Sequence, residues 1–478
     1  MRSSLFHRFI LFFLLLPFAA GAQSPSQGWS LQQCVDYALA NNITVLQADI
    51  NVEISKVNVL QSKANVLPAV NGTFSHAYNY GRTIDRFTNQ FANDRVLSQN
   101  FYLSANMIVF QGLQNWNSIK QNLHALNASR YQVDQTKNDI ALSVATAFLQ
   151  VLYAQESLDI ARKQSDLTRE QVKRTERLVE VGSLARGSLL DVQSQLAQEE
   201  LNQVNAENQL RLAYLSLTQL MNLDSATTFA IARPQIATPS EAILAITPEQ
   251  IYSSALNTQP GVKSGEESLK SADKAVDVAW GGLSPSVMLN AAYGTGYSGA
   301  SQQIQTTSWD GSTYDTTGIT TGGQFTLTPH FNYTFQTIPF SEQLDNNLNK
   351  SFGVQVNVPI FNRLQVHTGI RRAELQRENT RLGLEQTKLQ LYKDIRQAHA
   401  DASAALSRYK ASEKAVEAMR ESFRYTDQKF SVGAVNAIDY NTAKTQLTRA
   451  ESDLLQARYD YIFKLKVLDY YQGKPIMF

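Results

Sequence analysis

The pattern of apolar and polar residues predicts long helices separated by short strand-like segments. The first predicted helix spans residues 31–67 and ends ahead of Pro68, because helices commonly stop before a proline. After two strand-like segments, helical spacing resumes over residues 113–181. A glycine-containing break at residues 182–187 leads into another predicted helix over residues 188–222. The first half of the chain therefore has the order helix, strand, strand, long helix, helix.

The second half of the chain repeats this order, which indicates an internal duplication. When Phe110 is set against Phe361, a shift of 251 positions, the two halves align without gaps for roughly 110 residues. A second shift of 217 positions places Pro68 on Pro285, so the second copy has about 34 extra residues before Phe361. Part of this surplus, residues 298–323, is rich in Ser, Thr and Gly and is predicted to be a surface loop. The predicted elements of the second copy are helices at residues 248–283, 364–432 and 438–472 and strands near residues 286–297 and 351–360.

The predicted helices are too long for a compact globule. At about 1.5 Å per residue, the 69 residues of the segment 113–181 make a rod of roughly 100 Å. The two shorter helices of the same copy together match that length, which favours an antiparallel hairpin with the glycine break at its tip. Within the rod, the nearly all-apolar residues 141–154 are predicted to be buried, and the mostly polar residues 163–177 are predicted to be solvated.

The strand-like segments indicate a membrane. Residues 351–358 alternate between apolar and small or polar side chains, and the odd-numbered residues from Phe101 to Val109 are apolar in the same way. Such alternation over about 9–11 residues is typical of a transmembrane β-strand, although a half-buried sheet in a globular domain has the same pattern. Four strands cannot close into a barrel, and lipid does not tolerate an open sheet edge. Strands that span a membrane therefore require several chains to share one barrel.

The N-terminal residues and the composition indicate an exported protein without a cofactor. Arg2, Arg8 and the apolar run to Ala20 predict a signal peptide over residues 1–22. No later apolar run reaches the roughly 20 residues of a membrane-spanning helix. The single cysteine, Cys34, excludes a disulfide within the chain, and the six histidines lack metal-ligand spacing. A net charge of +1 does not suit a nucleic-acid partner.

Several short motifs resemble the TolC family of outer-membrane efflux proteins. They are residues 29–42 (WSLQQCVDYALANN), Leu67-Pro68 before the first strand, Phe110-Gln111-Gly112 and Phe361-Asn362-Arg363 after the later strands, and the Val-Gly pairs at 181–182 and 432–433. The duplicated order of helices and strands over essentially the whole mature chain is the more specific feature. The chain is therefore identified as a member of that family, with a first repeat and equatorial linker at residues 23–246 and a second repeat at residues 247–478.

The resemblance implies a mainly α-helical homotrimer with a small membrane β-barrel portion. Four strands from each of three chains would form a twelve-stranded barrel in outer-membrane lipid, and the helices would form a long periplasmic tunnel. Members of the family are passive exit ducts, not enzymes, and they engage a periplasmic adaptor and an inner-membrane pump. The pump is of the resistance-nodulation-division or the ATP-binding-cassette type and supplies the energy. This chain accordingly has no Gly-x-x-x-x-Gly-Lys-Ser/Thr loop for nucleotide.

The resemblance also suggests residues at the periplasmic mouth of the tunnel. An Asp six positions after the tip glycine lines this mouth in the family, and Asp439 follows Gly433 at that spacing. The family's second acid is Thr442 here, and its Arg two positions after the glycine is Val435. In the first copy, Asp191 occupies the position of the second acid. Asp439 and Asp191 are therefore the candidate aperture residues, although acids are also favoured near the start of any helix by its dipole.

The turns at the helix tips form a second candidate site. A sharp reversal between helices commonly needs a residue that tolerates positive φ, which explains Gly182 and Gly433. A second, functional interpretation is that these turns dock the adaptor. The candidate residues are Val181, Gly182, Ser183, Val432, Gly433 and Ala434.

Two other classes of function are compatible with parts of the pattern. A periplasmic coiled-coil tether would explain the rods, but it would not explain the transmembrane type of alternation in the strands. An enzyme would need reactive side chains that converge, whereas the candidates here are dispersed acids and isolated histidines on long helices. No motif specifies the cargo or the class of pump.

Overall fold

The computed structural model describes residues 28–85, 89, 91–92, 95–223, 229–233 and 244–474, so the predicted signal peptide lies outside the described residues. The chain divides into two compact units, each of which is described by itself. The hairpin unit contains the described residues within 1–47, 135–259 and 391–478, and the sheet unit contains those within 48–134 and 260–390.

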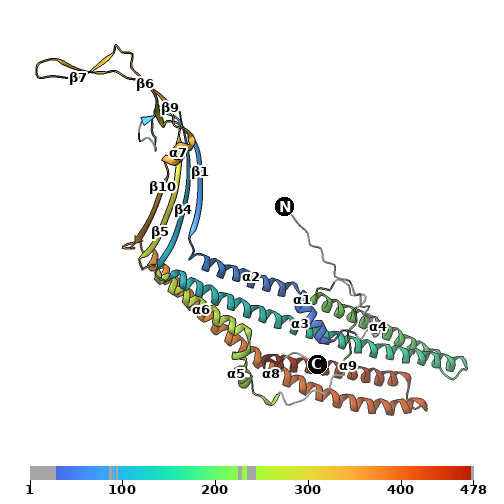
Figure 1. Cartoon of the computed structure of the whole chain (residues 1–478). Coiled ribbons are helices and arrows are strands. Elements are labelled where there is room, and N and C mark those ends of the chain that lie inside the picture. Colours follow the sequence, from blue (N-terminus) through green and yellow to red (C-terminus); the bar gives the residue numbers. More distant parts are fainter. Residues whose placement is uncertain are drawn as a thin grey trace, which may run out of the picture. The chain divides into compact units, whose positions relative to one another are not determined.

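The hairpin unit is built from helices that end in tight turns. Helices α3 (Gln114–Glu180) and α8 (Gln365–Ser431) each have 67 residues, or roughly 100 Å, and their C-terminal parts belong to this unit. Each turns back into a 35-residue helix, α4 (Arg186–Leu220) or α9 (Ala437–Tyr471), which runs beside it in Figure 1. The four helices predicted at residues 113–181, 188–222, 364–432 and 438–472 are confirmed to within two residues.

The duplication extends to individual side-chain contacts. An ion pair of 3.0 Å joins Arg169 of α3 to Glu200 of α4, and an ion pair of 2.9 Å joins Arg420 of α8 to Glu451 of α9. The residues of the second pair lie 251 positions after those of the first. Exposed pairs of this kind contribute only about 0–1 kcal/mol each to stability. Their value here is that they show the same helix-to-helix register in both hairpins.

The predicted continuous helices at residues 31–67 and 248–283 are wrong, because each is broken in two. Helix α1 (Leu31–Asn41) is separated from α2 (Ile43–Ala64) at Asn42, and α5 (Pro248–Thr258) is separated from α6 (Pro260–Gly281) at Gln259. Both residues have extended backbone, and proline at position 260 disfavours helical conformation at Gln259. The side-chain amides of both donate to main-chain oxygens far along the chain, Asn42 to Leu220 at 2.8 Å and Gln259 to Tyr470 at 3.2 Å.

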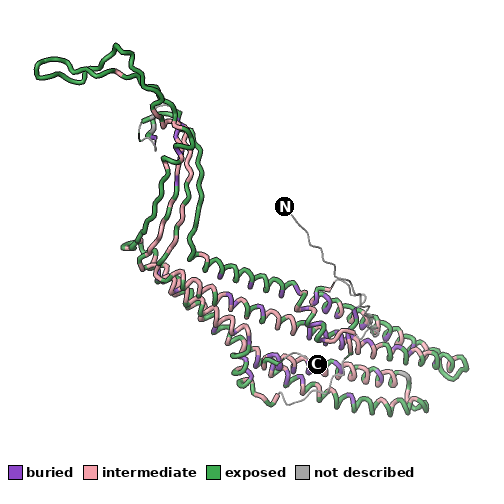
Figure 2. Tube along the Cα trace, in the orientation of Figure 1, coloured by how far each residue is buried: buried purple, intermediate pink, exposed green. Residues whose placement is uncertain are grey.

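The largest core of the hairpin unit surrounds the apolar part of α3. Figure 2 shows buried residues along this helix, and they include Val144, Phe148 and Val151, which are fully inaccessible to solvent. These side chains pack with residues of α1, α4 and α9 in one cluster. The predicted burial of residues 141–154 is thus confirmed. The predicted solvation of residues 163–177 is partly wrong, because Ser165, Thr168 and Thr175 are buried.

The sheet unit contains a four-stranded antiparallel sheet in the order β1-β4-β5-β10 (Figure 1). The strands are β1 (Ala69–Asn79), β4 (Val96–Gln111), β5 (Ser286–Ser298) and β10 (Asn349–Asn357). The predicted strands are confirmed, although β10 ends before Val358-Pro359, because proline has no N–H to donate to a neighbouring strand. Helix α2 leads into β1, and β10 leads into α8.

The predicted surface position of residues 298–323 is confirmed for most of this segment, but the prediction of a loop is wrong, because most of the insertion forms paired strands. Strands β6 (Gln302–Ser308) and β9 (Asn332–Thr337) pair with each other, as do β7 (Tyr314–Ile319) and β8 (Phe325–Pro329). The short helix α7 (Phe340–Asn346) then returns to β5, where the amide of Gln343 bonds both the N–H and the C=O of Ser298. The shorter first-copy connection contains the strand pair β2 (Thr83–Ile84) and β3 (Phe91–Ala92).

Candidate functional site

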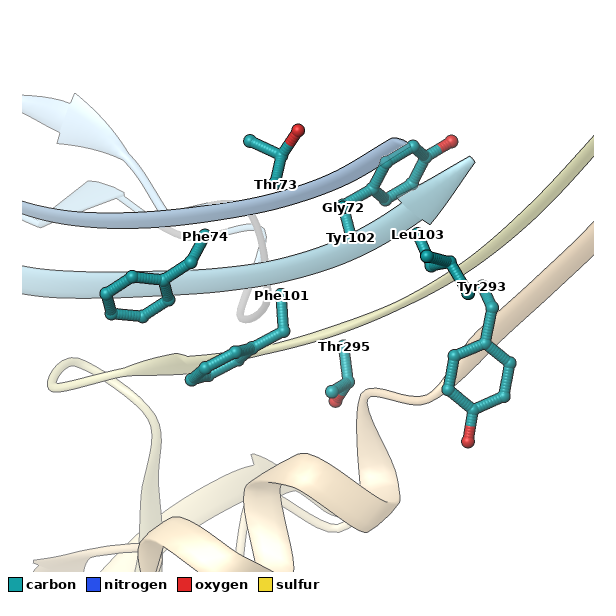
Figure 3. A pocket seen from close by; sticks show the side chains of 8 residues that line it. All are labelled: Gly72, Thr73, Phe74, Phe101, Tyr102, Leu103, Tyr293 and Thr295. Carbon is teal, nitrogen blue, oxygen red and sulfur yellow. The ribbon is translucent and has the colours of Figure 1, made fainter. Parts of the chain in front are cut away.

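The strand register gives the sheet two different faces. Directly opposed residues point to the same side of a sheet, and successive residues point to opposite sides. In β1, Phe74 is opposite Phe101, and Thr73 is opposite Tyr102. In Figure 3 the side chains of Phe74 and Phe101 point to one side, together with that of Thr295. The side chains of Thr73 and Tyr102 point to the other side.

One face of the sheet, here called the apolar face, carries mainly large apolar side chains. Gly72 leaves a hollow on the sheet surface, and Phe74, Phe101 and Leu103 are among the residues that line it (Figure 3). By register, the apolar face comprises Val70, Gly72, Phe74, His76 and Tyr78 of β1; Leu97, Gln99, Phe101, Leu103, Ala105, Met107 and Phe110 of β4; Val287, Leu289, Ala291, Tyr293, Thr295 and Tyr297 of β5; and Lys350, Phe352, Val354 and Val356 of β10.

The opposite face, here called the polar face, carries mainly amides, hydroxyls and small residues, with Val96, Ile108 and Met288 as apolar exceptions. Asn100 donates to Ser75, and Asn79 donates to Ser98, each at 3.1 Å. By register, the polar face comprises Ala69, Asn71, Thr73, Ser75, Ala77 and Asn79 of β1; Val96, Ser98, Asn100, Tyr102, Ser104, Asn106, Ile108 and Gln111 of β4; Ser286, Met288, Asn290, Ala292, Gly294, Gly296 and Ser298 of β5; and Asn349, Ser351, Gly353, Gln355 and Asn357 of β10.

The ring of Tyr102 is the largest side chain on the polar face, and it rests on a glycine. Gly294 is its cross-strand partner, and a Cβ at that position would meet the ring at 2.6 Å. Real Cβ atoms do not approach that closely, so only glycine allows the ring to lie flat against the sheet. Tyr102 stays half exposed.

Basic side chains lie over two tyrosine rings, Tyr78 at the end of the sheet nearest the insertion and Tyr293 in the middle of β5. The Lys350 ammonium is 5.6 Å from the ring centroid of Tyr293, and the Arg95 guanidinium is 4.9 Å from that of Tyr78. Both rings are on the apolar face. That the two rings share a face depends on the strand register, which the sequence alone does not give.

The two tip turns have the geometry that the glycines predict. Gly182 has a φ of +74° and Gly433 a φ of +75°. In each turn the following residue donates its N–H five residues back, Ser183 to Leu178 and Ala434 to Lys429, both at 2.8 Å. This pattern is a Schellman-type helix end. A Cβ added at either glycine would meet no atom within 4 Å, so the backbone conformation, and not a lack of space, requires glycine there.

The tips expose apolar side chains and the two candidate acids. Val181 and Val432 are 76% and 79% exposed. Asp191 and Asp439 are exposed as well. Asp439 lies in the first turn of α9, where its N–H donates to the side chain of Asn436, so a helix-start role fits this residue. The first turn of α4 contains no acid, and Asp191 lies beyond it, so the helix dipole explains Asp191 less well.

A buried charged cluster, missed by the sequence reasoning, joins α9 to the first hairpin. Lys444 is only 7% exposed, and its ammonium donates to the Thr168 hydroxyl at 2.9 Å. Glu199, 5% exposed, accepts from the amides of Gln195 at 2.7 Å and Gln164 at 3.3 Å. Burial lowers the pKa of Lys444, and the attraction of Glu199 opposes this shift only in part.

Two buried amide atoms near this cluster lack hydrogen bonds within the described chain. They are Nε2 of Gln171 and Oδ1 of Asn441, which lie three residues from Thr168 and Lys444 along their helices. Each unsatisfied buried group costs about 1–3 kcal/mol. The contact between the hairpins is therefore less stabilising here than in the apolar core around Phe148.

Comparison with known proteins identifies the family. A family model described as outer membrane efflux protein matches residues 34–223 and 251–471, which is most of the chain. This chain belongs to the outer membrane efflux protein family. The outer membrane protein TolC of Escherichia coli is 23% identical over 466 residues, covering 93% of this chain and 82% of that protein. TolC of Vibrio cholerae is 23% identical over 339 residues, covering 70% of this chain and 67% of that protein.

Solved structures of outer-membrane channels share the fold of this efflux-family chain. CusC has a TM-score of 0.73 at 14% identity and covers 95% of this chain and 96% of its own. OprN has a TM-score of 0.71 at 16% identity and covers 94% of this chain and 90% of its own. The chain is thus an outer-membrane efflux channel with a periplasmic helical part, and its family is one of channels, not enzymes.

The described residues contain neither a membrane-spanning helix nor a candidate metal site. None of the helices in that part of the chain combines the length and the hydrophobicity needed to cross a membrane. Nor do three or more His, Cys, Asp or Glu side chains come together there in a way that could hold a metal ion.

The lowered pKa of Lys444 predicts how stability depends on pH. The folded chain binds this proton less tightly than the unfolded chain, so the unfolded state holds more protons between the lowered pKa and the ordinary value of 10.5. Wild-type stability should therefore rise with pH in this window relative to Lys444→Met, as measured by thermal unfolding from pH 7 to 10.5. Lys163→Met, which removes an exposed lysine of α3, is the control. Parallel curves for wild type and Lys444→Met would contradict the assignment.

Proposed function

We propose that three copies of this chain form the outer-membrane exit duct of a tripartite efflux or secretion system. The duct combines one twelve-stranded β-barrel with a periplasmic helical tunnel, and it conducts its cargo passively. The observation that carries this proposal is a four-stranded sheet with two chemically different faces and two free edges.

The free edges of the sheet require partner strands in lipid. Strands β1 and β10 stand at the two ends of the strand order, and all of their residues are exposed. Unpaired N–H and C=O groups at such an edge have no water to bond within a bilayer. Successive strands of the sheet are antiparallel, so β10 of one copy is antiparallel to β1 of the next. Three copies thus close an even-numbered barrel without an edge.

The helices attached to the edge strands have a second, unpartnered apolar seam. On α2, Val52 and Val59 are buried in a cluster with residues of α3. The other side of α2 exposes large apolar side chains at intervals of three or four residues. Helix α8 exposes large apolar side chains at intervals of seven residues. Such heptad-like spacing is typical of a coiled-coil contact. These residues are Ile50, Ile54, Val57 and Leu60 on α2, and Leu375, Leu382 and Leu389 on α8. Because α2 continues into β1 and α8 follows β10, we propose that each seam packs on the neighbouring copy.

A charge in this seam should prevent assembly. Ile54→Glu places a carboxylate in the proposed contact between copies, and burying an unpaired charge costs several kcal/mol. We expect most of the purified variant to be monomeric in detergent, as measured by size-exclusion chromatography with light scattering. Asn51→Glu, at an exposed position of α2 off the seam, should leave the trimer intact. A trimeric Ile54→Glu variant would refute the seam.

The chemistry of the faces orients the sheet in the membrane. We assign the apolar face to lipid and the polar face to the lumen, as in other transmembrane barrels. Lipid chains then fill the hollow at Gly72. Tyr78, with Arg95 over its ring, suits the headgroup level, where amphipathic aromatic and basic side chains are favoured.

The tip turns are the proposed docking site for a periplasmic adaptor, which connects the duct to an inner-membrane pump. Their valines are exposed and their glycines touch no neighbouring side chain, so nothing in the described hairpin unit covers them. The only cysteine of the chain, Cys34, is buried, which leaves engineered thiols as the reactive ones.

Cysteine crosslinking tests this docking. Ser183→Cys and Ala434→Cys should each form disulfides with cysteines introduced at the helical tip of the cognate adaptor, as seen on non-reducing gels. Ser216→Cys, exposed near the other end of α4, is the control. The docking proposal fails if neither tip position crosslinks at any adaptor position.

The exposed acids near the tips are proposed to line the periplasmic aperture. One carboxylate from each repeat gives six in a trimer, and crowded negative charge attracts cations. The combined Asp191→Asn and Asp439→Asn substitutions should lower the K⁺/Cl⁻ permeability ratio in planar-bilayer recordings, whereas Asp191→Glu with Asp439→Glu should preserve it. An unchanged ratio in the Asn variant would remove both residues from the aperture.

A further inference from the structure

The polar face of the sheet has no charged side chain. None of its residues in β1, β4, β5 or β10 is Asp, Glu, Lys, Arg or His. The only two basic residues in these strands, His76 and Lys350, both lie on the apolar face, and the strands contain no Asp or Glu. The face that the proposed function turns towards the lumen is therefore neutral throughout the described strands.

Among the described residues, Asp85 brings a carboxylate to the edge of the polar face, and this carboxylate is withdrawn from solvent. Asp85 follows β2, and its carboxylate accepts a hydrogen bond from the hydroxyl of Ser298, the last residue of β5. Asp85 is only 5% exposed. Ser298 is itself fully buried and is held by Gln343 of α7. This acid is thus enclosed at the end of the sheet instead of projecting over it.

The groups that do cover the polar face can solvate either sign of charge. Asn and Gln side chains offer both N–H donors and C=O acceptors, and Ser and Thr hydroxyls do the same. Donors stabilise anions and acceptors stabilise cations, so such a surface has no built-in preference. This differs from the helix tips, where the exposed acids Asp191 and Asp439 favour cations.

We propose that the membrane segment of the duct is electrically neutral and passes anionic, cationic and uncharged polar solutes without selecting them by charge. The inference rests on the proposed function, because it needs the polar face to line the lumen of the trimer. It places any charge selection by this protein outside the four described strands, and it means that the barrel accepts cargo of either charge.

Charges introduced one at a time on the two faces test this inference. Purified full-length protein is inserted in planar bilayers, and reversal potentials are recorded in a KCl gradient. In 0.1 M salt, Asn100→Asp should raise the K⁺/Cl⁻ permeability ratio about twofold, and Asn100→Lys should lower it by a similar factor. The shifts should be nearly symmetric because no existing charge offsets either one. In about 0.01 M salt, where screening is weaker, both should grow.

The matched controls lie one residue away on the same strand. Gln99 is on the apolar face, so Gln99→Glu and Gln99→Lys should leave the permeability ratio unchanged. Ser104→Asp and Ser104→Lys repeat the test deeper on the polar face, in case the bond from Asn100 to Ser75 is needed for folding.

The outcomes separate the inference from the proposed function. Equal and opposite shifts at Asn100 or Ser104 alone support a neutral, polar-faced lumen. Shifts at Gln99 alone overturn it, because the apolar face would then line the lumen. A much larger shift for Asn100→Lys than for Asn100→Asp also overturns it, because the lumen would then already be negatively charged. A wild-type protein that forms no conducting trimer refutes the proposed duct itself.

Discussion

The requirement that backbone hydrogen-bonding groups be satisfied governs this protein. In water, the free edges of β1 and β10 would be solvated, but in the outer membrane each unpaired N–H or C=O costs several kcal/mol. A chain with only four strands in its main sheet cannot meet this requirement alone. The exposed seams on α2 and α8 fit the same proposal, since the helices beside the proposed barrel wall would also need neighbours. The proposed assembly is thus a consequence of solvent and topology.

Most elements of this architecture occur in both repeats, and the repeats differ at only a few places. The two repeats share the helix break, the tip turn and the Arg–Glu pair of the hairpin, each at a constant spacing in sequence. They differ where the second copy inserts β6 to β9 and α7. They also differ at Lys444, whose equivalent 251 positions earlier is Gln193. A quasi-repeated wall is well suited to a duct, because no single position has to recognise the cargo.

Packing stabilises some parts of the hairpin unit more than others. Around Phe148, apolar side chains from four helices exclude water, and replacing a large one with alanine would cost about 2–5 kcal/mol. Nearer the tips, the contact consists of hydroxyls, amides and the buried Lys444 and Glu199, with two amide atoms left unsatisfied. Segments with few apolar contacts open at lower free energy than well-packed cores. The least stabilised part of this unit is therefore the part that the proposed function requires to meet a partner.

Local periodicity determined much of this fold in advance. The 3.6-residue and two-residue periods and the tip glycines depend on neighbours within a turn or two, so helix lengths, strands, reversals and the duplication could be predicted from the sequence. The tertiary structure alone decided the contacts between distant segments. Asn42 ends α1 through a carbonyl 178 residues away, Lys444 is buried because α9 meets α3, and the Thr-rich insertion becomes strands only by pairing with itself. Likewise, the sequence showed that each strand alternates, but only the register between strands placed every charged side chain off the polar face. Which surfaces meet depends on the whole chain, and no local pattern records it.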